Sequence, residues 1–150
     1  VILEDLQDPG NLGTIVRTGE GAGVSAVCMT KNTGDIYNPK TIRATMGSIY
    51  RVPFAIVEDV KETIASLHKA GVKTYAAHLA GKDYYDSFSF MEGTAFLIGN
   101  EGNGLKDETA DAADVYMKIP MEGKVESLNA AVASVILMYE AARQRMSLLK

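Results

Sequence analysis

The chain has 150 residues, 47% of them hydrophobic, and a formal net charge of −4 at pH 7. This length fits a single domain, the apolar content excludes global disorder, and the acidic balance argues against a protein whose whole surface binds nucleic acid. The single Cys28 excludes an intrachain disulfide and indicates a reducing compartment, while Glu140, Arg143 and Arg145 interrupt the apolar segment 128–149 and exclude a membrane span there.

The first part of the chain predicts a strand, a turn and a helix. Residues 1–3, Val-Ile-Leu, form an apolar run typical of a core strand. Residues 8–11, Asp-Pro-Gly-Asn, predict a turn, and a helix is expected from Leu12. Three glycines in this helix mark either close packing or the helix end, because each costs about 1 kcal/mol relative to alanine inside a helix. They stand at positions 19, 21 and 23.

Strand-like and helix-like segments alternate along the rest of the chain. The apolar runs that predict strands are 26–30, 54–57, 73–79, 95–98 and 115–119. The segments that predict helices are 38–47, 59–71, 105–113 and 127 to the end. This alternation is typical of an α/β fold, so we expect one domain over residues 1–150, with a mostly parallel six-stranded sheet and helices on both faces.

The last of these helices carries two kinds of apolar residue. Larger side chains form one stripe at helical spacing: Leu128, Val132, Val135, Ile136 and Tyr139. Alanines at positions 130, 131, 133, 141 and 142 would let another backbone come close.

Two loops carry most of the functional information. Residues 97–105, Leu-Ile-Gly-Asn-Glu-Gly-Asn-Gly-Leu, and residues 119–130, Ile-Pro-Met-Glu-Gly-Lys-Val-Glu-Ser-Leu-Asn-Ala, each join an apolar strand-like run to a helix start. Loops of small and polar residues present backbone N–H and C=O groups to a ligand. Two of them in a parallel sheet predict a single cofactor site between strand ends.

A set of polar residues accompanies these loops at the strand ends: Asn11, Arg17, Glu101, Ser127 and Asn129. Each has an ordinary structural explanation, such as a helix cap for Asn11 or Ser127 and a solvated side chain for Arg17. Their common location at strand ends favours a site over five separate coincidences.

Other familiar motifs are absent from the sequence, which has no Walker phosphate loop, no dinucleotide-binding glycine pattern and no nucleophile elbow. His68 and His78 are separated by a whole helix-to-strand unit, so we expect no bound metal. Between Lys31 and Arg51 the chain is locally basic, which indicates either an anion-facing patch or a solvated face. The cations there are Lys31, Lys40, Arg43 and Arg51.

The motifs resemble those of the SpoU/TrmH family. Residues 8–18 resemble the first family motif, residues 99–105 the second, and residues 119–129 the third, in the same order and with ordinary spacing. Residues 46–53, with Met-Gly-Ser before Val-Pro, also fit. Gly19 and Gly21 stand where alanines are more usual.

This resemblance implies an RNA ribose 2′-O-methyltransferase that uses S-adenosylmethionine. By the same resemblance we expect a SPOUT α/β domain with a C-terminal trefoil knot, a homodimer, and a cytoplasmic location. Members usually carry an N-terminal RNA-binding domain, which is apparently absent from this chain. Ribosomal RNA is the favoured substrate, and transfer RNA is the alternative within the family.

The resemblance also implies roles for individual residues. The catalytic set is Asn11, Arg17, Glu101, Ser127 and Asn129. The cofactor is expected against the loop after the fourth strand, beginning at His78, and against the two loops above; the residues assigned to it are Leu79, Ala80, Gly99, Asn100, Glu101, Gly102, Ile119, Met121, Ser127, Leu128 and Asn129. RNA is expected at Arg17, Lys31, Lys40, Arg43 and Arg51, and no metal or membrane contact is expected.

Two alternatives to a catalytic methyltransferase domain remain open. One is a non-catalytic RNA-binding relative that kept the fold, which the intact polar set argues against. The other is a flavodoxin-like nucleotide or flavin binder, which also uses loops at strand ends but does not explain the third motif.

Overall fold

The computed structural model describes residues 1–146, in which strands and helices alternate as expected. The strands are β1 (Ile2–Leu3), β2 (Val27–Thr30), β3 (Phe54–Val57), β4 (Lys73–Ala77), β5 (Asp83–Tyr84), β6 (Thr94–Ile98) and β7 (Val115–Lys118). The helices are α1 (Pro9–Ala22), α2 (Pro39–Thr45), α3 (Val60–Lys69), α4 (Asp107–Ala112) and α5 (Ala130–Met146), with the short 3-10 turns η1 (Ser48–Tyr50) and η2 (Tyr85–Ser87).

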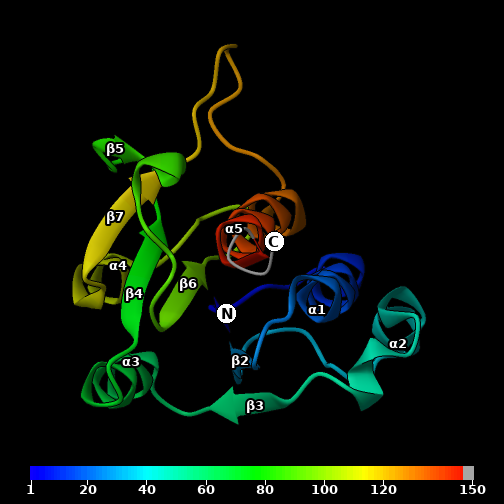
Figure 1. The fold of residues 1–150 in the computed structure, drawn as a ribbon. Coiled ribbons are helices and arrows are strands. Elements are labelled where there is room, and N and C mark those ends of the chain that lie inside the picture. Colours follow the sequence, from blue (N-terminus) through cyan, green and yellow to red (C-terminus); the bar gives the residue numbers. More distant parts are fainter. Residues whose placement is uncertain (147–150) are drawn as a thin grey trace.

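The strands form one seven-stranded sheet in the order β3-β2-β1-β6-β4-β7-β5, and every neighbouring pair is parallel. Helices α1, α2 and α5 lie on one face and α3 and α4 on the other (Figure 1). The prediction of an α/β fold with a mostly parallel sheet and helices on both faces is confirmed. The predicted number of six strands is wrong, because the two-residue β5 adds an edge strand beside β7.

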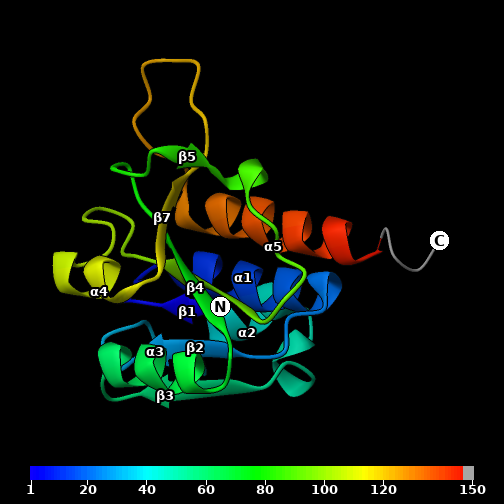
Figure 2. The same cartoon turned by 60° about the vertical axis from the view of Figure 1, so that its left-hand side comes forward.

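Successive side chains of each strand point to opposite faces of the sheet, and they pack into two separate hydrophobic cores. Ile2 and Leu97 point toward α3 and α4, where they pack with Ile64. Leu3 and Phe96 point to the opposite face and pack among residues of α1 and α5. Figure 2 shows the sheet between these two layers. Because both faces are covered, β1 is apolar throughout and β6 is apolar from Ala95 to Ile98.

Helix α1 begins earlier than the sequence predicts. Residues 8–11, expected as a turn, form its start: Asp8 is the N-cap, accepting a hydrogen bond from the Asn11 N–H at 2.8 Å, and Pro9 occupies the first turn, where its missing N–H costs nothing. The helix-cap explanation for Asn11 is therefore wrong. Gly23 ends the helix in a left-handed conformation, whereas Gly19 and Gly21 lie inside it.

Helix α5 begins later than the sequence predicts, at Ala130 instead of Ser127. The Asn129 side chain caps it by accepting from the N–H groups of Ala131, at 2.9 Å, and Val132, at 3.2 Å. Residues 147–150, which the prediction also assigned to this helix, lie outside the described residues.

The faces of α5 separate the two kinds of apolar residue. Its buried residues are mostly small: Ala130, Ala131, Ser134, Leu137, Met138, Ala141 and Ala142. On the stripe of larger side chains, Val132 and Tyr139 are about half exposed. The helix is therefore apolar on both its inner and its outer side.

The close contact of α1 with α2 generates a stability prediction at Gly13. A Cβ atom at this position would lie 2.5 Å from the Ala44 Cβ and 2.6 Å from the Thr41 carbonyl oxygen. We expect Gly13→Ala to lower the free energy of unfolding by about 1–2 kcal/mol, because contacts this short place the overpacking cost at about 2–3 kcal/mol and the helix-propensity gain returns only about 1 kcal/mol. Urea denaturation measures the change. Thr14→Ala, on the exposed side of the same helix, is the control, and equal stability of the two variants would contradict the prediction.

Candidate functional site

Four loops lie together at one edge of the sheet, where the carboxyl ends of the strands are. Since all strands are parallel, the segments that follow β1, β4, β6 and β7 leave from the same edge. The chain order reverses at β1, which lies between β2 on one side and β6 on the other. Ligands in open α/β sheets bind at such a switch point, beyond the carboxyl ends of the strands.

The loop after β6 is closed on itself. The backbone groups of Asn100 and Gly104 form two hydrogen bonds, at 3.0 and 2.9 Å, and the Asn100 Oδ1 accepts from the N–H groups of Gly102 and Asn103. Gly99 is required by packing, because a Cβ there would lie 2.0 Å from the carbonyl carbon of Gly104. The loop therefore has one compact shape.

The Glu101 carboxylate joins this loop to the segment after β1. Its Oε2 accepts from the Gln7 N–H at 3.0 Å, and its Oε1 accepts from the Asp8 N–H at 2.9 Å and from the Asn11 Nδ2 at 3.2 Å. Burial alone would raise the pKa of Glu101, but these donors outweigh it, and the pKa lies below its ordinary value. The carboxylate is thus held in its charged form.

The same network reaches the start of α5. The Asn129 Nδ2 donates to the Asn11 Oδ1 at 3.0 Å, while the Asn11 amide donates to Glu101. Asn11, Glu101 and Asn129, three of the five residues predicted to be catalytic, therefore form one chain of hydrogen bonds across three elements. Ser127 lies outside this chain on the exposed loop before α5.

A pocket of about 320 Å³ opens beside this network. Its walls come from the ends of β4 and β7, from the loop after β6 and from the segment before α5. Most of the predicted cofactor residues line it: Leu79, Gly99, Asn100, Glu101, Gly102, Ile119, Met121, Ser127 and Leu128. Ala80 and Asn129 do not: the Ala80 N–H donates to the Nδ1 of His78, and Asn129 caps α5.

The sequence interpretation missed several residues of the site. Gly104, Leu105 and Lys118 also line the pocket. Gly104 and Leu105 belong to the same loop as the predicted Gly99 and Gly102, and Lys118 directly precedes the predicted Ile119. Gln7 and Asp8 were missed because they contribute backbone N–H groups, which leave no side-chain signal in a sequence.

Arg17 lies on the exposed side of α1, and its side chain has no hydrogen bond or ion pair with any other residue from 1 to 146. Gly13 and Glu20, on either side of it at helical spacing, contact α2 and η1 respectively, which places Arg17 on the stripe of α1 that borders these elements. It does not share the side of the helix from which Asn11 reaches Glu101.

Two of the predicted RNA-binding cations are already paired. Lys31 forms an ion pair with Glu58, and Arg51 binds Glu20 through both Nε and Nη2. The Arg51 guanidinium and the Ser48 hydroxyl lower the pKa of Glu20 to about 2. Lys40 and Arg43 are exposed on α2 and, within the described part of the chain, have no carboxylate partner.

Among the residues that the structure describes, no group of three or more His, Cys, Asp or Glu side chains could hold a metal ion. Over the same part of the chain, no helix combines the length and the apolar character needed to cross a membrane.

The lowered pKa of Glu101 gives a pH prediction. Because folding lowers this pKa, the stabilisation by the carboxylate is complete above the unfolded-state value of about 4.3 and is lost as the pH falls through the lower folded-state value. We expect wild type to exceed Glu101→Gln in free energy of unfolding by a constant amount between about pH 7 and pH 5, and by less below about pH 4.

Chemical denaturation at a series of pH values measures this difference. Glu122→Gln, in the exposed loop after β7, is the matched control and is expected to give no such pH-dependent gap. A gap for Glu101→Gln that persists unchanged to pH 3 would rule out the proposed electrostatic link.

Comparison with known proteins places this geometry in a family. A family model described as the SpoU rRNA Methylase family matches residues 1–139. The chain is 36% identical over 139 residues to the 23S rRNA (guanosine(2553)-2'-O)-methyltransferase RlmP of Bacillus subtilis, covering 93% of this chain and 56% of that protein. It is 39% identical over 146 residues to a putative TrmH family tRNA/rRNA methyltransferase of Staphylococcus haemolyticus, covering 97% and 58%.

A solved structure agrees with these matches. The AdoMet-bound rRNA methyltransferase from Sinorhizobium meliloti superposes with a TM-score of 0.87 at 38% identity, over 95% of this chain and 54% of that one. The chain thus spans a little over half the length of these relatives. The motif residues lie together at one edge of the sheet, and the family model matches nearly the whole chain. The chain therefore belongs to the SpoU rRNA methylase family.

Proposed function

We propose that this chain is the catalytic domain of an RNA 2′-O-methyltransferase, which transfers a methyl group from S-adenosylmethionine to a ribose 2′-hydroxyl. The observation that carries the proposal is the pocket between the loop after β6 and the entry to α5, tied to α1 through Glu101, Asn11 and Asn129. The relatives named above supply the reaction class, and the S. meliloti relative is named as binding AdoMet.

The residues present fit this methyl donor. Its adenine ring is flat and largely apolar on its faces, and Leu79, Ile119 and Leu128 line the pocket with aliphatic side chains. The loop of residues 99–104, called the glycine loop below, places main-chain N–H and C=O groups in the same pocket, where they can form hydrogen bonds with the polar edge of the adenine. Glu101 and Glu126 add negative charge beside a donor that carries a sulfonium and an ammonium group.

When bound, S-adenosylmethionine supplies an electrophilic methyl group on sulfur. The chain's own residues then have to orient the two reactants, because in-line transfer depends mainly on position. We assign binding of the donor to the backbone at Gly99, Ile119 and Leu128. Asn11, Glu101, Ser127 and Asn129 are assigned to holding the ribose side of the site in place.

Arg17 is proposed to contact the RNA phosphate next to the reacting ribose and to stabilise the developing alkoxide. A guanidinium stays protonated at ordinary pH, so it serves better as a hydrogen-bond donor than as a general base. The exposed position of Arg17, apart from the network of Asn11 and Glu101, supports a role in the pocket of a second copy of the chain.

A homodimer is proposed on the same grounds. The outer side of α5 carries half-exposed Val132 and Tyr139 next to partly buried Val135 and Ile136, although the opposite side already packs on the sheet. A helix that is apolar on both sides is stable in water when both sides are covered.

The remaining family properties are proposed with it: a trefoil knot and a cytoplasmic location. The segment 85–93 passes close over α5 (Figure 2), where Gln144 donates to the Phe88 carbonyl at 3.0 Å and Arg145 donates to the Phe90 carbonyl at 2.9 Å. This contact supports a knot in which the chain passes through an earlier loop before it forms the last helix.

Ribosomal RNA is the favoured substrate, since the B. subtilis relative is named for 23S rRNA, while the S. haemolyticus relative is named for both tRNA and rRNA. Arg17, Lys40 and Arg43 are the proposed RNA contacts; Lys31 and Arg51 would first have to leave their carboxylate partners. With a net charge of −4, the isolated chain is expected to bind RNA weakly.

The proposed function is tested by binding and by transfer. We expect calorimetry to record saturable binding of S-adenosylmethionine and of its demethylated product, with one site per chain. We expect Arg17→Ala to keep this affinity and to lower methyl transfer to defined rRNA and tRNA fragments by about 100-fold or more, the usual cost of removing a donor to a developing oxyanion. Lys69→Ala, on α3, is the control. Absence of donor binding would refute the function, and equal loss of binding and transfer would refute the role of Arg17.

The shared site is tested by mixed dimers. Leu128→Arg is expected to block donor binding, and Arg17→Ala to block transfer, so each homodimer is inactive. A heterodimer of the two variants retains one pocket that has both an intact donor site and an intact arginine from the other chain, and we expect roughly half of the wild-type activity. A heterodimer as inactive as its parents would place Arg17 and the pocket in the same chain.

A further inference from the structure

Asp5 has an unusual backbone and an unusual number of contacts. It lies two residues after the end of β1 and has a φ of +54°, in the left-handed region that L residues rarely adopt. In the described residues only Met46 shares this property among those that are not glycine. The conformation therefore requires an explanation from the surroundings of Asp5.

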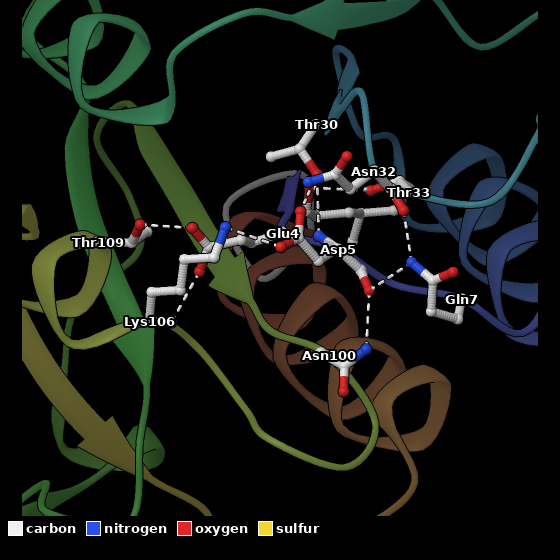
Figure 3. Close-up of polar contacts among 10 residues, drawn as sticks. Glu4, Asp5, Gln7, Thr30, Asn32, Thr33, Asn100, Lys106 and Thr109 are labelled. Carbon is white, nitrogen blue, oxygen red and sulfur yellow. Dashed lines mark hydrogen bonds and ion pairs between the residues drawn. The ribbon is translucent and has the colours of Figure 1, made fainter.

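Every polar atom of Asp5 is engaged, and its partners come from different parts of the fold (Figure 3). The Asp5 N–H donates to the Thr30 Oγ1 at 2.9 Å, and the Thr30 hydroxyl donates to the Asp5 Oδ1 at 2.8 Å, at the end of β2. The Oδ2 pairs with the Lys106 Nζ at 2.8 Å, and the carbonyl oxygen accepts from the Asn100 Nδ2 at 2.8 Å and the Gln7 Nε2 at 3.0 Å.

These contacts fix the turn that directs the backbone toward Glu101. The chain leaves β1 along the sheet, turns at Asp5, and within three residues presents the N–H groups of Gln7 and Asp8 to the Glu101 carboxylate. At the same turn, the Asp5 carbonyl holds the side chain of Asn100, whose Oδ1 shapes the glycine loop. One residue thus determines both sides of the contact between the two loops.

The neighbouring Glu4 holds the ion-pair partner in place. Glu4 is buried, and its carboxylate accepts from the Lys106 N–H at 2.8 Å and from the Thr109 hydroxyl at 2.5 Å. The backbone of Lys106 is therefore fixed at the start of α4, and its ammonium group can meet Asp5 without a large loss of entropy.

We propose that Asp5 is a positioning residue for methyl transfer: its left-handed turn sets the glycine loop and the Glu101 link that frame the donor pocket. This proposal rests on the function proposed above. The carboxylate stabilises the turn, and the backbone conformation does the positioning. Aspartate, asparagine and glycine tolerate positive φ, alanine tolerates it poorly, and β-branched valine is the least compatible.

A series of substitutions at Asp5 tests this inference. We expect the dissociation constant for S-adenosylmethionine, measured by calorimetry at a temperature where every variant is folded, to rise in the order Asp5→Asn, Asp5→Gly, Asp5→Ala and Asp5→Val. Asp5→Asn is expected to stay within about threefold of wild type, since it keeps the turn. Asp5→Val is expected to lose about 10- to 100-fold in kcat, the scale of a misplacement near 1 Å.

Asp59→Ala separates positioning from general destabilisation. Asp59 caps α3 by accepting from the N–H groups of Lys61 and Glu62, and it does not line the pocket. This variant is expected to lower the melting temperature and to leave donor affinity and kcat unchanged. Amide hydrogen exchange adds a readout without ligand: Gln7 and Asp8 are expected to lose protection in Asp5→Val and to keep it in Asp59→Ala.

The outcomes distinguish the two proposals. If wild type binds the donor and all four Asp5 variants bind it equally well, or if Asp5→Asn is as impaired as Asp5→Val, the positioning role is wrong while the function stands. If wild type binds no donor, the proposed function is wrong, whatever the Asp5 variants do. The positioning role is also overturned if donor affinity falls in proportion to melting temperature in every variant, Asp59→Ala included.

Discussion

One carboxylate joins the two halves of the sheet at the edge where the pocket lies. β1 and β6 are neighbours, but the segment after β1 leads to α1, whereas the loop after β6 leads toward α4. Glu101 accepts backbone N–H groups from Gln7 and Asp8, and such charge-assisted hydrogen bonds are stronger than neutral ones. Through Asn11 the same carboxylate is linked to Asn129 and so to α5. The shape of the pocket therefore depends on a charge that the fold itself keeps ionised.

Much of this arrangement could be predicted where the chemistry is local. Two glycines are needed where the loop after β6 closes on itself: Gly99 has no room for a side chain, and Gly104 has a φ of +68°. The alternation of apolar runs with helical segments determines a parallel sheet, and a parallel sheet gathers the loops at one edge. The fold class and the location of a site at the strand ends follow from these two facts, whereas the individual pocket residues were predicted from the family resemblance.

Other features depend on contacts that are distant in sequence, and these could not be predicted. Ser127 and Asn129 are both good N-caps, and Asn129 caps α5 in a structure where its amide also meets Asn11, 118 residues away. Strand β5 has only two residues and exists through its pairing with β7. The buried side of α5 could not be identified from the sequence because apolar residues lie on both its inner and its outer side, so hydrophobic spacing favours no single face.

The distribution of charge separates the two tasks of the proposed enzyme. The donor pocket draws its walls and its polar network from residues of a single chain. Few cations are available for RNA phosphates: Lys31 and Arg51 are paired with carboxylates, and the chain as a whole is acidic. Since affinity for RNA grows with the number of phosphates that cations neutralise, a few unpaired cations give little binding by themselves. In the enzyme proposed above, this fold provides the chemistry of transfer, and selection of the RNA depends on cations beyond the few unpaired ones among the described residues.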